Sequence, residues 1–419
     1  MTTDDFILLH ATDDVRKLAL STFPEGVDLP TALTQIEGRQ LALKKLPSWA
    51  SLEGIRWPKR ISLEQCSSEA TSRYKRRIIE SSGILKEKHR TFADLTAGLG
   101  VDFAALAPWF DKAYYVECQE ELCALARRNL PLLGCAHAVV ICGEGEGWLA
   151  ESAEPLDLIM IDPARRDQAG RKVMLIEDCT PDVCAMQQML RRQARWTLIK
   201  LSPMLDITAA LRVMQGVVAV HVVSVEGECK EVLLLMASDE SLWLSQDAVP
   251  VHCVNLMQTG EEAAPIFTFT RSEEQQMSVP YASRLGSWLY EPHASLLKAG
   301  AFKSVAERYG FHKLAPMSHL YTNDECVSAF PGRIWQVEAW STFQKKDLRQ
   351  LLAGLDEAEL SVRGFPMSVA SLRQKLKLRD GAGAHFIATT LVDGQKVLVK
   401  VRQVSVAPQP SEPQDPQHR

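Results

Sequence analysis

TFADLTAGLGVD, residues 91–102, joins a short apolar run to a glycine-rich turn. Residues 92–95 are apolar except for Asp94, which predicts a buried parallel strand that ends in the turn. Gly98 and Gly100 allow positive φ angles and a close approach of the backbone to a ligand. The run AALAPWF at residues 104–110 predicts a helix, and helix N-termini offer free N–H groups and a partial positive charge. The stretch therefore predicts a strand, a ligand-binding turn and a helix.

The composition is that of an ordinary soluble globular protein. The 419 residues are enough for two or three domains, and 46% are hydrophobic and 24% charged. The net charge of -5 means that any nucleic-acid binding has to rest on local basic patches. No apolar run approaches the ~20 residues that a membrane-spanning helix needs, and the N-terminus lacks a signal-peptide pattern. We therefore expect a cytoplasmic protein without a membrane partner.

The cysteines do not predict a metal site. Ten of them are spread from Cys66 to Cys326, and none forms a CxxC pair. The closest spacings also lack histidines at ligand distance. Free thiols in a reducing cytoplasm and the absence of a metal cofactor are the expected consequence.

Residues 91–237 alternate between strand and helix patterns. After the first strand, further strands are predicted at residues 113–117, 137–144, 156–164 and 196–203, and a hairpin at 217–225 and 230–237. One strand of that hairpin must run antiparallel. Five parallel strands followed by a hairpin are expected of the class I methyltransferase sheet, whereas other Rossmann proteins usually have a sixth parallel strand.

Four of the predicted strands end in residues that suit a bound nucleoside. In open α/β sheets the ligand lies beyond the carboxyl ends of the strands. Glu117 ends the second strand about 20 residues after the turn, where an acidic residue accepts hydrogen bonds from ribose hydroxyls. The candidate cofactor-binding residues are Asp94, Thr96, Ala97, Gly98 and Gly100 at the turn, Glu117, Gly143 and Glu144 toward the adenine, and Asp162.

The sequence of the turn distinguishes between two kinds of cofactor. Dinucleotide binding requires G-x-G-x-x-G, but here the pattern is D-x-T-A-G-x-G-x-D, without a third glycine at that spacing. An acidic residue in the turn repels a pyrophosphate and suits a cation. Asp94 is therefore predicted to hold the charged amino group of S-adenosylmethionine, and a methyltransferase is favoured over a dehydrogenase.

The sequence also resembles known families. Residues 91–237 look like a class I S-adenosylmethionine-dependent methyltransferase, and DLTAGLGVD is similar to the turn of an rRNA guanine-N2 methyltransferase family. The wider chain resembles the bacterial class I methyltransferases with a C-terminal THUMP-like domain. THUMP domains bind RNA in other enzymes, so the resemblance implies an RNA substrate. The matching motifs are LEQCSSEATSRYK (63–75), DLTAGLGVD (94–102), IDPARRD (161–167), EDCTPD (177–182), EPHASLLKAGAF (291–302), SHLYT (318–322) and RGFPMSVASLRQKLKLRDG (363–381).

The fourth strand ends differently from that of typical base methyltransferases. Amino-group methyltransferases usually have Asn/Asp-Pro-Pro-aromatic there, whereas Ala164 and Arg165 follow Pro163 here. Uridine C5-methyltransferases need a cysteine nucleophile after the fifth strand, where this chain has KLSP at residues 200–203. Direct in-line transfer is therefore favoured. The candidate catalytic residues are Asp162, Pro163, Arg165 and Lys200, although Lys200 also suits a salt-bridge cluster that holds the rim.

Two segments are basic enough to contact a phosphate backbone. Residues 73–90 contain seven Lys/Arg and two Glu, and residues 361–402 contain eight Lys/Arg and two Asp. A solvated face is the structural alternative for both. In residues 63–75, which lead into the turn, Ser67 or Ser68 could cap the helix that carries Tyr74, and the functional alternative is a lid or floor over the glycine turn. The candidate substrate-binding residues are Tyr74, Lys75, Arg166, Arg373, Lys375, Lys377 and Arg379.

The predicted architecture is α/β, with a Rossmann-like methyltransferase sheet as its catalytic part. The expected order is a helical segment at 1–85, the methyltransferase domain at 86–240, a connecting α+β region at 241–330, a THUMP-like α+β domain at 331–405 and a disordered tail at 406–419. The expected function is methylation of structured RNA, rRNA or tRNA, with S-adenosylmethionine. Methylation of a small molecule or a protein, and a non-catalytic cofactor- or RNA-binding module, are the alternatives; the oligomeric state is left open.

Overall fold

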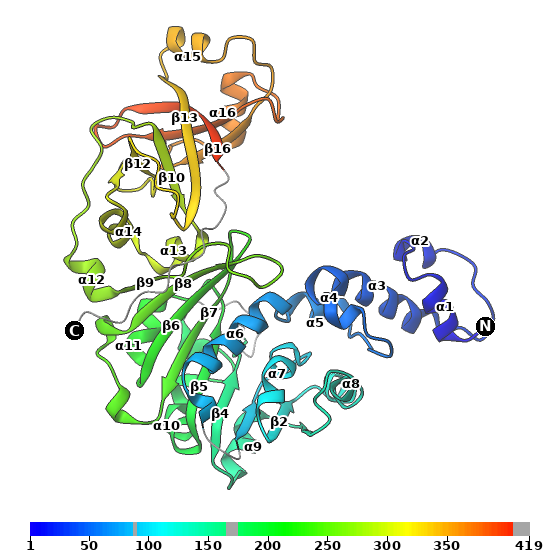
Figure 1. The fold of residues 1–419 in the computed structure, drawn as a ribbon. Coiled ribbons are helices and arrows are strands. Elements are labelled where there is room, and N and C mark those ends of the chain that lie inside the picture. Colours follow the sequence, from blue (N-terminus) through cyan, green and yellow to red (C-terminus); the bar gives the residue numbers. More distant parts are fainter. Residues whose placement is uncertain (87–89, 165–174, 405–419) are drawn as a thin grey trace. The chain divides into compact units, whose positions relative to one another are not determined.

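The structure is a computed structural model that describes residues 1–86, 90–164 and 175–404. The contacts divide the chain into two compact units. Unit 1 contains Met1–Val220, Glu231–Gln246 and Leu256–Glu261. Unit 2 contains His221–Lys230, Asp247–Asn255 and the chain from Glu262 onward. Figure 1 shows the elements along the chain, and each unit is described by itself below.

The first sheet has the strand directions predicted from the sequence. Within the described residues the order is β3-β2-β1-β4-β5-β7-β6-β8-β9. Strands β1 to β5 pair in parallel, and β7 pairs antiparallel with β5, so the five parallel strands and the reversed strand are confirmed. The strands are β1 Thr91–Asp94, β2 Lys112–Glu117, β3 Ala138–Cys142, β4 Leu156–Ile161, β5 Ala194–Leu201, β6 Val217–Val225, β7 Glu228–Ala237, β8 Pro250–Leu256 and β9 Phe267–Thr270.

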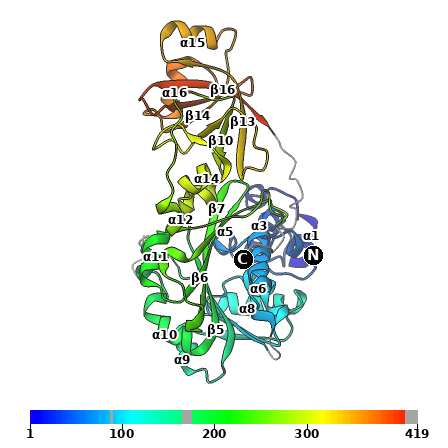
Figure 2. The same ribbon diagram turned by 60° about the vertical axis from the view of Figure 1, so that its left-hand side comes forward.

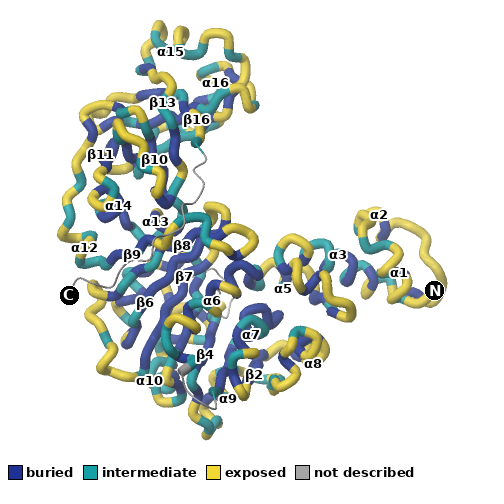
Figure 3. Tube along the Cα trace, viewed as in Figure 1, coloured by how far each residue is buried: buried dark blue, intermediate teal, exposed yellow. Residues whose placement is uncertain are grey.

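Helices cover both faces of the parallel strands. Figure 2 shows α6 and α8 on one side of the sheet and α10 and α11 on the other. The central strands are apolar on both faces and buried, as Figure 3 shows for β4 to β7. The helices next to these strands are α6 Glu69–Ser81, α7 Val101–Leu106, α8 Glu120–Leu132, α9 Gly145–Glu151, α10 Val183–Gln193 and α11 Ile207–Val213.

The N-terminal helices pack onto the glycine turn. Leu46, Trp49 and Leu63 are buried in one cluster with Leu99 and Val101, which lie in and just after the turn. This burial fixes the segment before α6 against the carboxyl end of β1. The helices of this segment are α1 Thr3–Leu9, α2 Val15–Leu18, α3 Leu29–Lys45, α4 Pro47–Ala50 and α5 Arg60–Gln65.

Unit 2 contains the second sheet, with the order β11-β12-β10-β13-β16-β15-β14. The Asp393-Gly394 turn joins two strands of this sheet into a hairpin, because β15 and β16 pair antiparallel. Residues 294–309 form two helices instead of one continuous helix, because Gly300 adopts φ 79 and ends the first. The elements are β10 Trp288–Pro292, β11 His312–Lys313, β12 Tyr321–Asn323, β13 Gly332–Thr342, β14 Glu359–Arg363, β15 His385–Thr390 and β16 Lys396–Val404, with helices α12 Arg271–Gln276, α13 Ala294–Ala299, α14 Phe302–Tyr309, α15 Lys345–Leu351 and α16 Val369–Leu376.

Among the helices that the structure describes, none is long and apolar enough to cross a membrane. The domain boundaries expected from the sequence stay predictions, and the tail from residue 406 lies outside the described residues.

Candidate functional site

A cavity of about 1150 Å³ opens beyond the carboxyl ends of the parallel strands, entirely within unit 1. Its volume suits a nucleoside-sized cofactor together with part of an acceptor. Its wall comes from the ends of β1 to β5, from the N-terminal segment between Ser62 and Ser67, and from the segment Cys179–Asp182. The site therefore lies where open α/β sheets place their ligands.

The glycine turn after β1 is tied to the end of β2. The N–H of Gly98 donates to Glu117 Oε2 at 2.9 Å, and the other carboxylate oxygen accepts from the N–H of Gln119 at 2.9 Å. The hydroxyl of Tyr115 donates to the carbonyl of Gly98. Gly98 and Gly100 adopt φ 56 and 84, angles that residues with a Cβ seldom take. The positions of the turn and of the Glu117 carboxylate are thus set together.

The end of β3 also closes on β1 and β2. The N–H of Gly143 donates to the carbonyl of Glu117 at 3.0 Å. At Gly145 a Cβ would lie 2.3 Å from the carbonyl oxygen of Leu95, closer than any side chain can approach. Glycine at this position therefore lets the start of α9 reach the backbone of the turn, which narrows the cavity between them.

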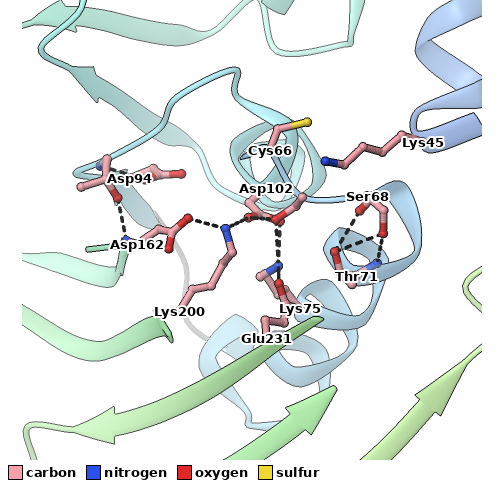
Figure 4. A network of polar contacts seen from close by, with 12 residues as sticks. Lys45, Cys66, Ser68, Thr71, Lys75, Asp94, Asp102, Asp162, Lys200 and Glu231 are labelled. Atoms are coloured by element: carbon pink, nitrogen blue, oxygen red, sulfur yellow. Dashed lines mark hydrogen bonds and ion pairs between the residues drawn. The ribbon is translucent and has the colours of Figure 1, made fainter. Parts of the chain in front are cut away.

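The end of β4 carries Asp162 into the same cavity. Its N–H donates to Thr96 Oγ1 at 2.6 Å, while the Thr96 N–H donates to Asp94 Oδ1 at 3.1 Å. The ammonium of Lys200, from β5, pairs with the Asp162 carboxylate. Figure 4 shows Asp94, Asp162 and Lys200 grouped at the edge of the sheet. Two carboxylates and one ammonium thus meet where the strands end.

Comparison with solved structures gives a match to the whole chain. The crystal structure of a candidate methyltransferase from Porphyromonas gingivalis W83 is 37% identical, covers 96% of this chain and 97% of that chain, and superimposes with a TM-score of 0.83. A family model described as THUMP domain-like matches residues 332–403, and one described as a ferredoxin-like domain matches residues 288–331. The chain belongs to the class I S-adenosylmethionine-dependent methyltransferases that carry a THUMP-like domain.

Curated relatives agree with this assignment. Uncharacterised S-adenosylmethionine-dependent methyltransferases from two strains of Mycobacterium tuberculosis are 24% identical over 80% of this chain and 84% of their own. A protein-L-isoaspartate O-methyltransferase from Alcanivorax borkumensis is 39% identical over 85 residues, which are 20% of this chain and 38% of that protein. The protein is thus a methyltransferase, and S-adenosylmethionine is its cofactor.

A buried ionic network of the methyltransferase lies behind the cavity wall. Lys75, on α6, has its side chain fully buried and lies 3.0 Å from Asp102 Oδ1 and 2.7 Å from Glu231 Oε2. Ser67 donates to Asp102 Oδ2 at 2.6 Å, and Lys200 Nζ lies 4.0 Å from the same oxygen. The network therefore runs from Asp162 at the cavity to Glu231 on β7 (Figure 4).

Burial and neighbouring charges together shift the pKa values of these groups in different directions. Burial raises the pKa of Asp94 well above its ordinary value, and the nearby carboxylates of Asp102 and Asp162 add to that rise. Burial also acts to raise the pKa of Asp102, but Lys75 and Lys200 outweigh it, so that pKa is lowered. Burial acts to lower the pKa of Lys200, but the surrounding carboxylates, Asp162 first, raise it above its ordinary value. Lys200 is accordingly a stable ammonium.

The structure brings most of the predicted site residues together. The candidate cofactor residues Asp94, Thr96, Ala97, Gly98, Gly100, Glu117, Gly143, Glu144 and Asp162 all line the cavity, and so does Lys200. Pro163 is buried just behind Asp162. Arg165 and Arg166, predicted for the acceptor side, lie outside the described residues. Among the residues that are described, no group of His, Cys, Asp and Glu is arranged to hold a metal ion.

Three residues predicted to bind substrate are engaged elsewhere. Tyr74 and Lys75 are buried, because α6 turns these side chains toward the sheet, so neither presents a surface to a phosphate. Arg373 donates to the carbonyls of Ala358 and Arg379 and pairs with Asp380 at 2.6 Å, so it holds its own domain together. The basic segment around Lys75 thus contributes to the interior as well as to a solvated face.

Sequence reasoning missed several cavity residues. Ser67, Asp102 and Cys179–Asp182 line the cavity, yet the sequence analysis assigned none of them individually to the binding of a ligand. Asp102 occupies the last position of DLTAGLGVD and could have been found by asking why a helix start carries a second acidic residue. Glu231 gave no signal, because it lies inside an apolar strand pattern and meets Lys75 only through the fold.

Proposed function

We propose that this methyltransferase transfers the methyl group of S-adenosylmethionine to RNA. The observation that carries the RNA substrate is the THUMP domain-like match at residues 332–403, because THUMP domains bind RNA in other enzymes. The exposed residues Lys375, Lys377 and Arg379 supply positive charge within that match. Their charges support contact with a phosphate backbone.

The cavity residues fit the cofactor by shape and by charge. The carboxylate of Glu117 is positioned beside the turn for ribose hydroxyls, and the segment from Gly143 to Gly145 lies where the adenine would rest. Asp94 lies in the cavity wall, where burial raises its pKa well above the ordinary value. An ammonium group of the cofactor would supply a cation and favour the charged form of that carboxyl group.

The chemistry proposed is direct in-line transfer. The bound cofactor supplies a methyl group that its sulfonium has already activated. Asp162 would accept a hydrogen bond from the N–H or O–H of the acceptor and take its proton as the new bond to carbon forms. Lys200 would keep the Asp162 carboxylate in place through its ion pair, so that the acceptor atom is aligned before transfer.

A second basic element lies beside the exposed charges of α16. Helices α15 and α16 share one apolar cluster, in which Phe343 and Leu348 pack with Leu372. The ammonium of Lys375 lies 5.4 Å from the centre of the Phe343 ring. Lys345, Lys346 and Arg349 on α15 are also exposed. The proposed RNA-binding face therefore comprises the exposed basic residues of α15 and of residues 375–379.

The test is transfer of labelled methyl from S-adenosylmethionine to total RNA from cells that lack this protein. The wild type is compared with Asp162→Asn, which keeps the size of the side chain but removes its charge and its capacity to take a proton. We expect nuclease-sensitive label with the wild type and a loss of at least about 100-fold with the variant. Digestion of the labelled RNA then identifies the nucleoside.

Cofactor binding by both proteins serves as the control, measured by calorimetry. Label that is removed by protease but not by nuclease would show that the methyl acceptor is a protein. Cofactor binding without labelled RNA would refute the RNA proposal and leave the methyltransferase assignment in place.

A further inference from the structure

Five charged side chains form one contact network next to the cofactor cavity. Asp102, Asp162 and Glu231 carry negative charge, whereas Lys75 and Lys200 carry positive charge. Asp102, Asp162 and Lys200 line the cavity directly. Lys75 and Glu231 are not among the lining residues; they lie behind the wall, with 0% and 3% of their side chains exposed.

The negative charges in this network outnumber the positive ones. Three carboxylates against two ammonium groups leave one net negative charge, and Asp94 in the same wall is a fourth carboxyl group. Glu231 Oε1 is buried and has no hydrogen-bond partner among the described residues. An unpaired buried carboxylate oxygen raises the free energy of the folded protein. A positive charge placed nearby would be stabilised by the net negative charge of the network.

The cofactor and its product differ in charge. S-adenosylmethionine bears a sulfonium and a net charge of about +1 at neutral pH, whereas S-adenosylhomocysteine has a neutral thioether and no net charge. A fixed negative charge beside the cavity favours the first ligand over the second. The contacts to the adenine, the ribose and the amino acid are shared by both ligands, so they give no such preference.

We propose that Lys75 and Glu231 determine how strongly the enzyme prefers the charged cofactor over its neutral product. Neither side chain needs to touch the ligand, because they set the charge of the wall through Asp102, which Lys75 contacts directly. The proposal rests on the cofactor occupying the cavity as proposed above. It gives the ion pair between α6 and β7 a role in product release as well as in folding.

The size of the effect follows from Coulomb's law. In a medium of effective dielectric constant about 20, one unit charge about 10 Å from another changes the affinity for a cation by about tenfold, whereas a neutral ligand is unaffected. Glu231→Gln removes one negative charge and should lower the preference for S-adenosylmethionine by about that factor. Lys75→Met removes one positive charge and should raise the preference. The double variant should return it close to the wild-type value.

The experiment is calorimetric measurement of the Kd of both ligands for the wild type, the two single variants and the double variant. All measurements share one pH above neutrality, because burial raises the pKa of Glu231 and a higher pH favours its charged form. Glu154→Gln is the matched control: Glu154 pairs with Lys112 at 2.7 Å at the opposite end of the strands, so it changes the same charge far from the cavity. The control should keep the wild-type ratio of the two Kd values.

Opposite shifts of the ratio of the two Kd values in the two single variants support the proposal. A merely structural role would weaken the binding of both ligands to the same extent. Ratios within about twofold of the wild type in Glu231→Gln would overturn it, and that variant alone decides the matter if Lys75→Met does not fold. A wild type that binds neither ligand would instead refute the cofactor placement on which the proposal rests.

Discussion

At the scale of single residues, three polar groups of the cavity are held by a residue on or next to the end of another strand. Glu117 holds the N–H of Gly98, Thr96 holds the N–H of Asp162, and Lys200 holds the Asp162 carboxylate. Such cross-strand contacts position the reactive groups before a ligand arrives, which reduces the reorganisation that catalysis requires.

Removal of Lys200 should affect transfer more than cofactor binding. In Lys200→Met, Asp162 loses the cation that positions it, and misplacement of a reactive group by about 1 Å costs up to about 100-fold in rate. We expect kcat to fall by about 10- to 100-fold, while the Kd of S-adenosylmethionine should not rise, because the loss of a positive charge beside the cavity favours a cationic ligand. Single-turnover methyl transfer checks this. Equal losses in the two quantities would show that Lys200 acts through the cofactor instead.

The stacked histidines of β6 and β8 predict acid sensitivity. Burial lowers the pKa of His221 to about 3, and the neighbouring His252, whose ring centre lies 4.6 Å away, adds to this. The unfolded chain takes up the proton near pH 6.5, so the free energy of unfolding should fall as the pH drops from about 6.5 toward 3, by up to about 1.4 kcal/mol per pH unit. Urea unfolding of the wild type and His221→Phe across this range checks it. The slope should be smaller in the variant, and an unchanged slope would contradict the assignment.

At the scale of elements, the site depends on where α9 begins. Gly145, its first residue, lies against the backbone of Leu95, whereas a Cβ at Gly147 two residues later would meet nothing within 4 Å. Alanine at Gly145 would add a steric clash, whereas alanine at Gly147 would not. Alanine improves the helix propensity at both positions, so a comparison of the two variants isolates the steric effect.

The pair of alanine variants tests the requirement for space at Gly145. Gly145→Ala should lower the stability by about 1–3 kcal/mol, because the added methyl group pushes α9 away from the turn, and it should weaken cofactor binding as the cavity wall moves. Gly147→Ala should be neutral or stabilising. Urea unfolding and calorimetry measure both effects, and equal behaviour of the two variants would contradict the steric explanation.

The end of α16 is the element on which RNA binding should depend. Replacement of Lys375, Lys377 and Arg379 by Gln removes three exposed charges and should weaken RNA binding while the Kd of S-adenosylmethionine stays the same. The matched control replaces the exposed Arg16, Lys17 and Lys44 of the N-terminal helices by Gln. The RNA affinities of the two triple variants are compared by electrophoretic mobility shift. Equal losses of affinity would mean that RNA binding depends on the net charge of the protein and not on the location of the charges.

At the scale of the whole molecule, an acidic chain is expected to bind RNA through a local basic face. The net charge of -5 opposes binding, so the attraction has to come from few contacts and should depend steeply on salt. Each lost phosphate contact reduces the slope of log K against log salt by about 0.7. The variant in which Gln replaces Lys375, Lys377 and Arg379 should therefore have a slope that is smaller by about 2. An unchanged slope would place the RNA on another surface.

The sequence by itself determined the parallel sheet, its reversed strand and the glycine turn that lines the cavity. These features are local: apolar runs, Gly98 and Gly100, and the acidic residues Asp94, Glu117 and Asp162 at strand ends, which the topology then gathers at one edge. The hairpin around residues 393–394 has an equally local signal, since the Asp393-Gly394 turn and its two flanking strands are adjacent in the chain.

Only the tertiary structure decided which charges face water and which are buried. Lys75 and Glu231 are 156 residues apart, and Lys75 stood within a basic run that is typical of a solvated face. The helix carrying Lys75 packs onto β7, so its ammonium finds two carboxylates in the interior. The physical reason is that a local pattern fixes the face of a helix but not the partner that covers it, and a charge can be buried only where the fold brings an opposite one to meet it.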